Sequence, residues 1–462
     1  MSDPARGRSR CALLPAMLNV LAGALFLSPP AVAMDAVTFP QALARAFRGN
    51  PALAVAGLEY SASQEQVDAA RGNFFPGLAF EHRFIRTDVP AEAFALKLNE
   101  AQLAQSDFLD VQNFNDPPPR NDFISTFTLE QPLFVPEVYL GHRMAKAESE
   151  AKRLELLRAK EETAFQVLTA YLDVLTAKSY LAVAEQELSD SREHQRIAEA
   201  AEKTGTGLSS DVLRTKVSVA SAEGGKVTAE NRLELARRGL ALAMGETGAG
   251  PVDVSGPPPE FPDPGTLEER QAAASARADL QAGSVRVENA GNIVSLRKSE
   301  YLPTVGLFGA YQLDAEAGPL QIDNRSWRVG VGLKWNLFDG LRRESGVSKA
   351  AFDHRKAQEH HRGEKDRASF QVTGAYLGIR EAQRRVEIAR AAEASAEEGV
   401  RRIRARYENQ LGRMIDLLDA QSALHQVRAD AVRAENDLRQ SRARLLYVSG
   451  TLLPWAEKET GQ

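Results

Sequence analysis

The sequence predicts a mainly helical fold with a smaller β component, built as a tandem repeat of one structural unit. Three observations support this prediction: a gap-free internal repeat, heptad spacing in long segments, and four short stretches of alternating apolar and polar residues. Of the 462 residues, 43% are hydrophobic, 26% are charged and 7% are aromatic, which is typical of long packed helices.

Residues 1–33 are expected to be an export signal. Three arginines within the first ten residues precede an apolar stretch, and an A-x-A cleavage pattern ends at Ala33, so the mature chain should begin at Met34. An uncleaved membrane anchor is the alternative, but the apolar stretch is short for a membrane span. Cys11, the single cysteine, lies inside this signal, so the mature chain should have no disulfide and no cysteine-based metal site.

Charge and motifs exclude several classes of function. The formal net charge of −5 argues against a nucleic-acid partner, and the arginine-rich stretch 401–406 is interpreted as a solvated helix face. The sequence has no phosphate-binding loop and no nucleophile elbow, so neither an enzyme nor a cofactor is expected. His360 and His361 are interpreted as solvated rather than as metal ligands. After the signal no run of 18 apolar residues occurs, so any membrane span should be made of strands.

The internal repeat is the most informative feature of the chain. Residues 165–245 align with residues 370–450 at a constant offset of 205, and upstream Pro76 pairs with Pro303 at an offset of 227. The difference between these two offsets corresponds to additional residues in the first half of the chain. We therefore expect a first repeat at 34–247, a Pro/Gly-rich linker at 248–265, a second repeat at 266–450 and a C-terminal tail at 451–462.

Each repeat is predicted to run helix, strand, loop, strand, long helix, tight turn, helix. The last helix follows a strict 3–4 spacing from Leu417 through Leu424, Ala431 and Leu438 to Val448. The long helix before the turn in the first repeat has two adjacent apolar seams, which lets one helix pack against neighbours on both sides, as a ring of helices requires. If continuous, residues 140–204 would span about 100 Å.

Four strands are predicted, near 77–86, 122–134, 304–313 and 326–338. In the last of them apolar residues alternate with small or polar ones, which is the pattern of a membrane strand with a wet interior. The residues expected to face lipid are Trp327, Val329, Val331, Leu333 and Trp335. A half-buried strand of a soluble sheet has the same pattern, but four such strands in two hairpins favour the membrane.

Four strands are too few to close a barrel, so several chains should pool their strands, and three chains would give twelve. The first hairpin has a long loop, about Thr87 to Asn121, of the kind found on the extracellular side of such barrels. We interpret this loop as solvated surface without a binding role.

At this point the sequence resembles the TolC family of outer-membrane efflux and secretion channels over nearly all of the mature chain. Each stretch is weak alone, but their order and duplication are specific. The resembling stretches are Asn50-Pro51-Ala52-Leu53, Phe75-Pro76, Glu130-Gln131-Pro132-Leu133-Phe134, Arg277-Ala278-Asp279-Leu280, Tyr301-Leu302-Pro303, Trp335-Asn336-Leu337-Phe338-Asp339-Gly340 and Asp416-Leu417-Leu418-Asp419-Ala420-Gln421.

The resemblance implies a homotrimer with a twelve-stranded barrel in the outer membrane and a twelve-helix barrel in the periplasm. It also implies a periplasmic adaptor and an inner-membrane pump of the resistance-nodulation or ABC type. Drugs, metal ions or polypeptides all remain open as cargo. The alternative function is an exported coiled-coil structural protein or adhesin without a pore, which would explain the heptads but not the alternating strands.

The resemblance also implies site residues at the two helix–helix turns. A periplasmic gate would comprise Asp416, Asp419, Tyr407, Arg413 and Asp211, with Arg413 one position away from the family's gate arginine. Carboxylates crowded around a narrow mouth should raise one another's pKa and hold cations, although acids are also common at helix starts. The turns expected to dock the adaptor contain Gly205, Gly207, Gln410 and Gly412, and Gln410 stands where the family usually has glycine.

Overall fold

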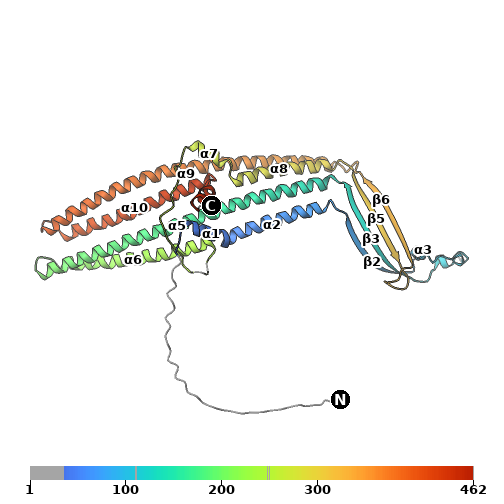
Figure 1. The fold of residues 1–462 in the computed structure, drawn as a ribbon, viewed down its shortest axis with the longest axis horizontal. Helices are drawn as coiled ribbons and strands as arrows, with labels where there is room; N and C mark the ends of the chain where they lie inside the picture. Colours follow the sequence, from blue (N-terminus) through green and yellow to red (C-terminus); the bar gives the residue numbers. More distant parts are fainter. Residues whose placement is uncertain (1–35, 110–111, 247, 249, 461–462) are drawn as a thin grey trace, which may run out of the picture.

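The structure is a computed structural model that describes residues 36–109, 112–246, 248 and 250–460. The predicted signal and the expected start at Met34 lie outside these residues. The chain is elongated, with long helices running through most of its length and a sheet at one end (Figure 1). The helices of the two repeats lie side by side.

The helices occur in equivalent sets in the two halves of the chain. A 22-residue helix, a helix of 68 or 67 residues and one of 36 or 35 residues follow each other in each half. The helices are α1 (Phe39–Gly49), α2 (Pro51–Gly72), α3 (Pro90–Asn99), α4 (Gln112–Asn115), α5 (Pro136–Lys203), α6 (Ser209–Met244), α7 (Leu267–Ala274), α8 (Ala278–Ser299), α9 (Arg342–Glu408), α10 (Met414–Val448) and α11 (Leu452–Thr460), with a 3₁₀ turn at Gln105–Phe108.

The strands form two sheets. Short β1 (Ala36–Val37) and β4 (Asp253–Val254) pair in parallel. The larger sheet is antiparallel throughout, in the order β2-β3-β5-β6. Its strands are β2 (Gly77–Thr87), β3 (Arg120–Phe134), β5 (Thr304–Asp314) and β6 (Asn324–Lys334).

The last strand ends earlier than the sequence predicted. β6 stops at Lys334 rather than near residue 338, so Trp335 lies beyond the strand, and its indole nitrogen donates to the Tyr301 carbonyl at 3.0 Å. The following residues turn toward α9, where the Arg343 guanidinium donates to the Leu337 carbonyl at 3.1 Å. These side chain–backbone bonds take the place of further strand pairing.

Strand register places most of the apolar residues of the larger sheet on one face and most of its polar residues on the other. Paired residues lie on the same face, and the pairs Phe80–Phe127, Phe127–Tyr311 and Tyr311–Trp327 run across all four strands. We call this the apolar face; it also carries Leu78, Phe84, Phe123, Leu129, Leu307, Val329, Val331 and Leu333. The opposite, polar face carries Glu81, Arg83, Arg120, Asp122, Thr126, Thr128, Glu130, Gln312, Ser326, Arg328 and Lys334.

Helix α5 is the central element of the helical part. It contacts α2, α6, α8 and α10, in agreement with two apolar seams on one helix. Among the described residues, α5 is also the helix with an 18-residue window apolar enough to cross a membrane, with a mean hydropathy of 1.3. Leu168 and Leu172 in this helix are fully buried against other helices, so we assign its apolar residues to the protein core.

The main core lies near the middle of α5, where both chain-terminal elements and the linker pack against it. The segment predicted as a C-terminal tail forms α11 instead, because Leu452, Trp455 and Ala456 have an apolar surface to cover. The Trp455 indole stacks on Phe39 at 5.7 Å and on Phe261 at 5.3 Å between ring centroids. The linker is thereby fixed across the helices.

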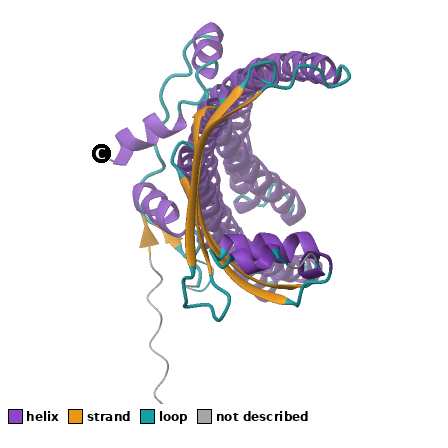
Figure 2. Cartoon of the chain, turned by 90° about the vertical axis from the view of Figure 1, so that its right-hand side faces the viewer, coloured by secondary structure: helices purple, strands orange, loops and turns teal. Residues whose placement is uncertain are grey.

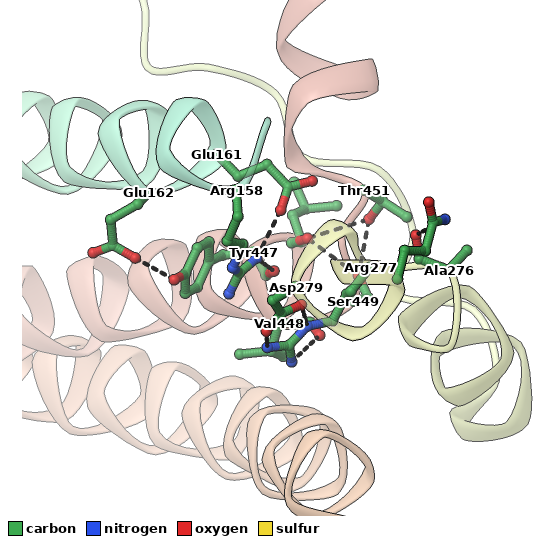
Figure 3. Close-up of polar contacts among 12 residues, drawn as sticks. Arg158, Glu161, Glu162, Ala276, Arg277, Asp279, Tyr447, Val448, Ser449 and Thr451 are labelled. Carbon is green, nitrogen blue, oxygen red and sulfur yellow. Dashed lines mark hydrogen bonds and ion pairs between the residues drawn. The ribbon is translucent and has the colours of Figure 1, made fainter. Parts of the chain in front are cut away.

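A second junction holds the residue before α8 against the end of α10 through buried polar contacts (Figure 3). The Arg277 side chain, 6% exposed, donates to the Val448 carbonyl at 3.2 Å and pairs with Asp279 at 2.6 Å. In the first repeat, Asn50 occupies the equivalent place and donates to the Ala243 carbonyl at 2.9 Å. Both repeats therefore have a hydrogen bond at this position, although different side chains make it.

The same junction attaches α5 to the end of α10. The Arg158 guanidinium lies 4.0 Å from the centroid of the Tyr447 ring and also pairs with Glu161 at 2.7 Å. The Tyr447 hydroxyl donates to the Glu162 carboxylate. Burial and then this hydrogen bond raise the pKa of Tyr447 to about 12, so the phenol keeps its proton.

Candidate functional site

The candidate site is the pair of turns at the end of the helices farthest from the larger sheet (Figure 1). The two turns have the same hydrogen bonds at the repeat offset. The Gly205 amide donates to the Glu202 carbonyl at 3.0 Å, and the Gln410 amide donates to the Tyr407 carbonyl at 2.9 Å. The next amide in each turn makes a further bond back into the long helix, at 3.0 and 2.8 Å.

The missing glycine in the second turn does not change its backbone shape. Gln410 has φ 60°, close to the φ of 74° at Gly205, so a side chain adopts the left-handed conformation that glycine accepts freely. The second glycine of each turn is favoured for a different reason, which is the lack of space for a side chain. A Cβ on Gly207 would lie 2.8 Å from the Ala201 Cβ, and one on Gly412 would lie 3.3 Å from the Tyr407 nitrogen.

Asp416 is held by its neighbour Arg413 at the start of α10. The guanidinium donates to the two carboxylate oxygens at 2.8 and 3.2 Å, which makes Arg413 a capping partner within the same turn. This hydrogen bond holds the pKa of Asp416 below its usual range. The pKa increase predicted from carboxylate repulsion concerns the mouth of a trimer and stays a prediction, whereas within one chain Arg413 has the opposite effect on Asp416. Asp419 is exposed one turn further along α10.

Tyr407 and Asp211 come together from different repeats. Tyr407 is half-buried near the end of α9, and Asp211 lies in the first turn of α6. Burial and then the nearby Asp211 carboxylate raise the pKa of the Tyr407 phenol, which places the two groups within electrostatic range. The structure thus brings together these two residues, which are about 200 positions apart in the sequence.

An apolar cluster beside the turns joins four helices and was not identified from the sequence. Its buried members come from α5, α6 and α10, and Tyr407 packs against them from α9. The buried residues are Ala198, Val212, Met414 and Leu417. The internal repeat could have indicated this cluster, because Val212 and Leu417 follow the two turns at equivalent positions.

A buried polar cluster lies between α5 and α10, two to three helical turns from the site. The Gln421 amide donates to Asp190 at 2.6 Å, and His425 Nε2 lies 3.4 Å from the same carboxylate. His194 is 1% exposed, and neither ring nitrogen has a hydrogen-bond partner among the described residues. Sequence reasoning missed this cluster because His194 occupies an ordinary seam position of α5.

Low pH is expected to weaken the packing of α5 on α10 at this cluster. Burial lowers the pKa of His194 and of His425, with Arg404 adding to the effect on His194, so the unfolded chain binds protons at a higher pH than the folded chain does. This contribution to stability is present above the ordinary histidine pKa and is lost as the pH falls below it. The thermal unfolding temperature should therefore fall less between pH 7.5 and about 5.5 in His194→Leu than in the unmodified protein. Equal slopes would contradict this assignment.

Metal binding is not supported by the described part of the chain, which contains no group of three or more His, Cys, Asp or Glu side chains placed to hold an ion. His360 is exposed, but His361 is not solvated as predicted. Its ring packs against α8, where a Cβ on Gly283 would lie 2.8 Å from the imidazole Nδ1.

Long helices ending in two equivalent turns, with a two-faced sheet at the other end, define the fold of outer-membrane channel subunits. The outer membrane protein VceC from Vibrio cholerae has this fold, with a TM-score of 0.75 and 16% identity. The match covers 89% of this chain and 96% of that one.

The chain belongs to the outer membrane efflux protein family, whose profile matches residues 42–246 and 270–451. It is 29% identical to the outer membrane efflux protein BepC of Brucella suis over 72% of this chain and 74% of the relative. It is 24% identical to the alkaline protease secretion protein AprF of Pseudomonas aeruginosa, over 72% and 70%. The family consists of outer-membrane transport channels rather than enzymes, so a structural protein without a pore is not favoured.

Proposed function

We propose that this chain is one protomer of a homotrimeric exit duct for a tripartite efflux pump or a type I secretion system. The observation that carries the proposal is the continuous apolar face of a four-stranded sheet whose edge strands, β2 and β6, have no partner within the described chain. In lipid, unpaired edges are too costly, so β6 of one protomer would pair with β2 of the next.

Three copies would give a closed barrel of twelve strands with the apolar face toward lipid and the polar face toward the lumen. The long helices α5, α6, α9 and α10, together with α2 and α8, would continue this barrel as a periplasmic tunnel of twelve helices in cross-section. The two apolar seams of α5 support the proposal, because every helix in a ring has two neighbours.

The two turns would form the periplasmic mouth. Asp416 and Asp419 of three chains would place six carboxylates around it, and contact between Tyr407 and Asp211 would hold the closed form. The exposed Leu208 beside the first turn would offer an apolar contact to a periplasmic adaptor, which in turn binds the inner-membrane transporter. Opening would then require a partner that binds the separated helices more tightly.

Conductance of the purified protein in planar bilayers tests the gate. We expect a cation-preferring channel in which Asp419→Asn lowers the cation preference by about two-fold or more, because half of the carboxylates at the mouth are removed. Asp416→Asn should have the smaller effect, since Arg413 already balances that charge. Asp353→Asn, which breaks an exposed pair with Lys349 far from the turns, is the control.

The possible outcomes distinguish the proposed gate from the proposed duct. Selectivity that is unchanged in both gate variants would contradict the gate while leaving the duct intact. A pure, folded protein that forms no conducting pores in any variant would contradict the duct.

A further inference from the structure

The polar face of the larger sheet is covered at the end farthest from the helices. Asp122 and Ile124 on β3 are 0% and 7% exposed, and Asp314 on β5 is 1% exposed. Thr126 and Thr128 lie farther along the same face of β3 and are half-exposed. A segment of the chain must therefore lie over this end of the sheet, although the face would border an open lumen.

The covering segment is α3 with the turn that follows it, residues 90–102. Figure 2 shows this helix at the outer end of the curved sheet and on its concave side. Ala93 and Leu96 of this helix are buried, and Glu100, directly after it, is 2% exposed. The loop between β2 and β3 was predicted to be solvated surface, and this part of it is folded back onto the sheet.

Polar contacts attach the segment to both hairpins. The Arg120 guanidinium, at the start of β3, pairs with Glu100 at 2.8 Å and donates to Gln102 at 2.5 Å. It also pairs with Glu316 of the second hairpin at 3.3 Å. The Asn324 side chain, at the start of β6, donates to the Asn99 carbonyl at 2.6 Å. The segment begins just after β2 ends and reaches Asn324 of β6, and because these strands are the two edges of the sheet, the segment extends across its full width.

The positive charge of Arg120 stabilises the packing of residues 90–102 on the sheet. Burial raises the pKa of Glu100, which its pairing with Arg120 opposes. Without the guanidinium, Glu100 would be a buried carboxylate with no cation beside it, next to the buried Asp122. Such an uncompensated charge would favour release of the segment into water.

We propose that residues 90–102 form an exit lid, which folds into the outer mouth of the barrel and narrows it from the extracellular side. The inference rests on the proposed duct, in which the concave polar face borders the lumen. Three lids, one from each chain, lie around the exit. The duct therefore has a constriction at each end, and passage of a large cargo requires release of the contacts made by Arg120.

Cysteine labelling from outside intact cells tests the lid. The expected mature chain has no cysteine, so Thr126→Cys supplies a single thiol on the polar face below the lid. A polyethylene-glycol maleimide of several kilodaltons is the probe, because general porins exclude it. Labelling should become about tenfold faster when Arg120→Gln is added, since the lid then opens more often.

Two further variants make the test independent of one substitution. Arg86→Gln is the matched control, because Arg86 lies at the same end of the sheet but bonds Asn121 at 2.9 Å and no residue of the lid. In a second variant, the nine residues 315–323 of the second hairpin replace residues 88–119, which removes the lid entirely. This variant should label at least as fast as Arg120→Gln.

Equal labelling of Thr126→Cys with and without the lid would overturn the lid and leave the proposed duct standing. The labelling of Val329→Cys gives a separate test of the duct. Val329→Cys lies on the opposite, apolar face; if it reacts with a small impermeant maleimide while Thr126→Cys stays unreactive in the lidless variant, the assignment of the two faces is wrong.

Discussion

Arginine in place of Val331 should prevent stable insertion of the protein into the outer membrane. Val331 lies near the middle of β6 on the apolar face, and its side chain is 65% exposed in the single chain. A charge at the bilayer midplane costs about 2–4 kcal/mol in each strand, and a trimer would carry three of them. We expect fewer trimers in the outer-membrane fraction, measured by detergent extraction and native mass spectrometry.

The neighbouring Gly332 provides the matched control. It points to the polar face, and a Cβ there would meet the Phe308 ring at 3.9 Å, an ordinary contact. Gly332→Arg should therefore insert and form trimers normally but lower single-channel conductance. If the two arginine variants insert equally well, the proposed orientation of the sheet is refuted.

Loss of the Arg277 guanidinium should have the largest effect in the helical part. In Arg277→Met the Val448 carbonyl loses a buried donor and Asp279 loses its partner, at a cost of about 2–3 kcal/mol. Because this junction attaches the start of α8 to the end of α10, the thermal unfolding temperature of the detergent-solubilised protein should fall clearly.

The same substitution at an exposed ion pair is the control for Arg277. Arg384 and Glu387 form such a pair on α9, with side chains 73% and 64% exposed, and Arg384→Met should cost less than about 0.5 kcal/mol. A similar fall in unfolding temperature for both variants would mean that the buried contacts of Arg277 add nothing to stability.

Periodic patterns in the sequence predicted most of the helices and strands. The alternation around Trp327 and Val329 predicted a two-faced strand, and the heptad positions of α10 predicted a long packed helix, because both patterns record which side of an element is buried. The same alternation predicted the end of β6 near residue 338, which is too late, since the bonds of Trp335 and Arg343 to distant carbonyls leave no periodic signal.

Features that depend on contacts between distant residues were the ones missed. The inward fold of α3 depends on Arg120 meeting Glu100 and Glu316, which the composition of a loop does not indicate. The φ of Gln410 follows from the shape of the turn rather than from its side chain. The sequence located the predicted site residues at the two turns, but it did not indicate that Arg413 bonds Asp416 within its own turn.

The unbroken length of α5 has a mechanical consequence. The helix is anchored by the main core near Leu172, and about 45 Å of it extends from there to Lys203 at the first turn. In the proposed duct it would act as a lever with its fulcrum in the core. A tilt of about 5° at the fulcrum moves the turn by about 4 Å, which follows from the rise per residue of a rigid helix. In the proposed trimer, three such small tilts would widen the mouth by about the diameter of a side chain.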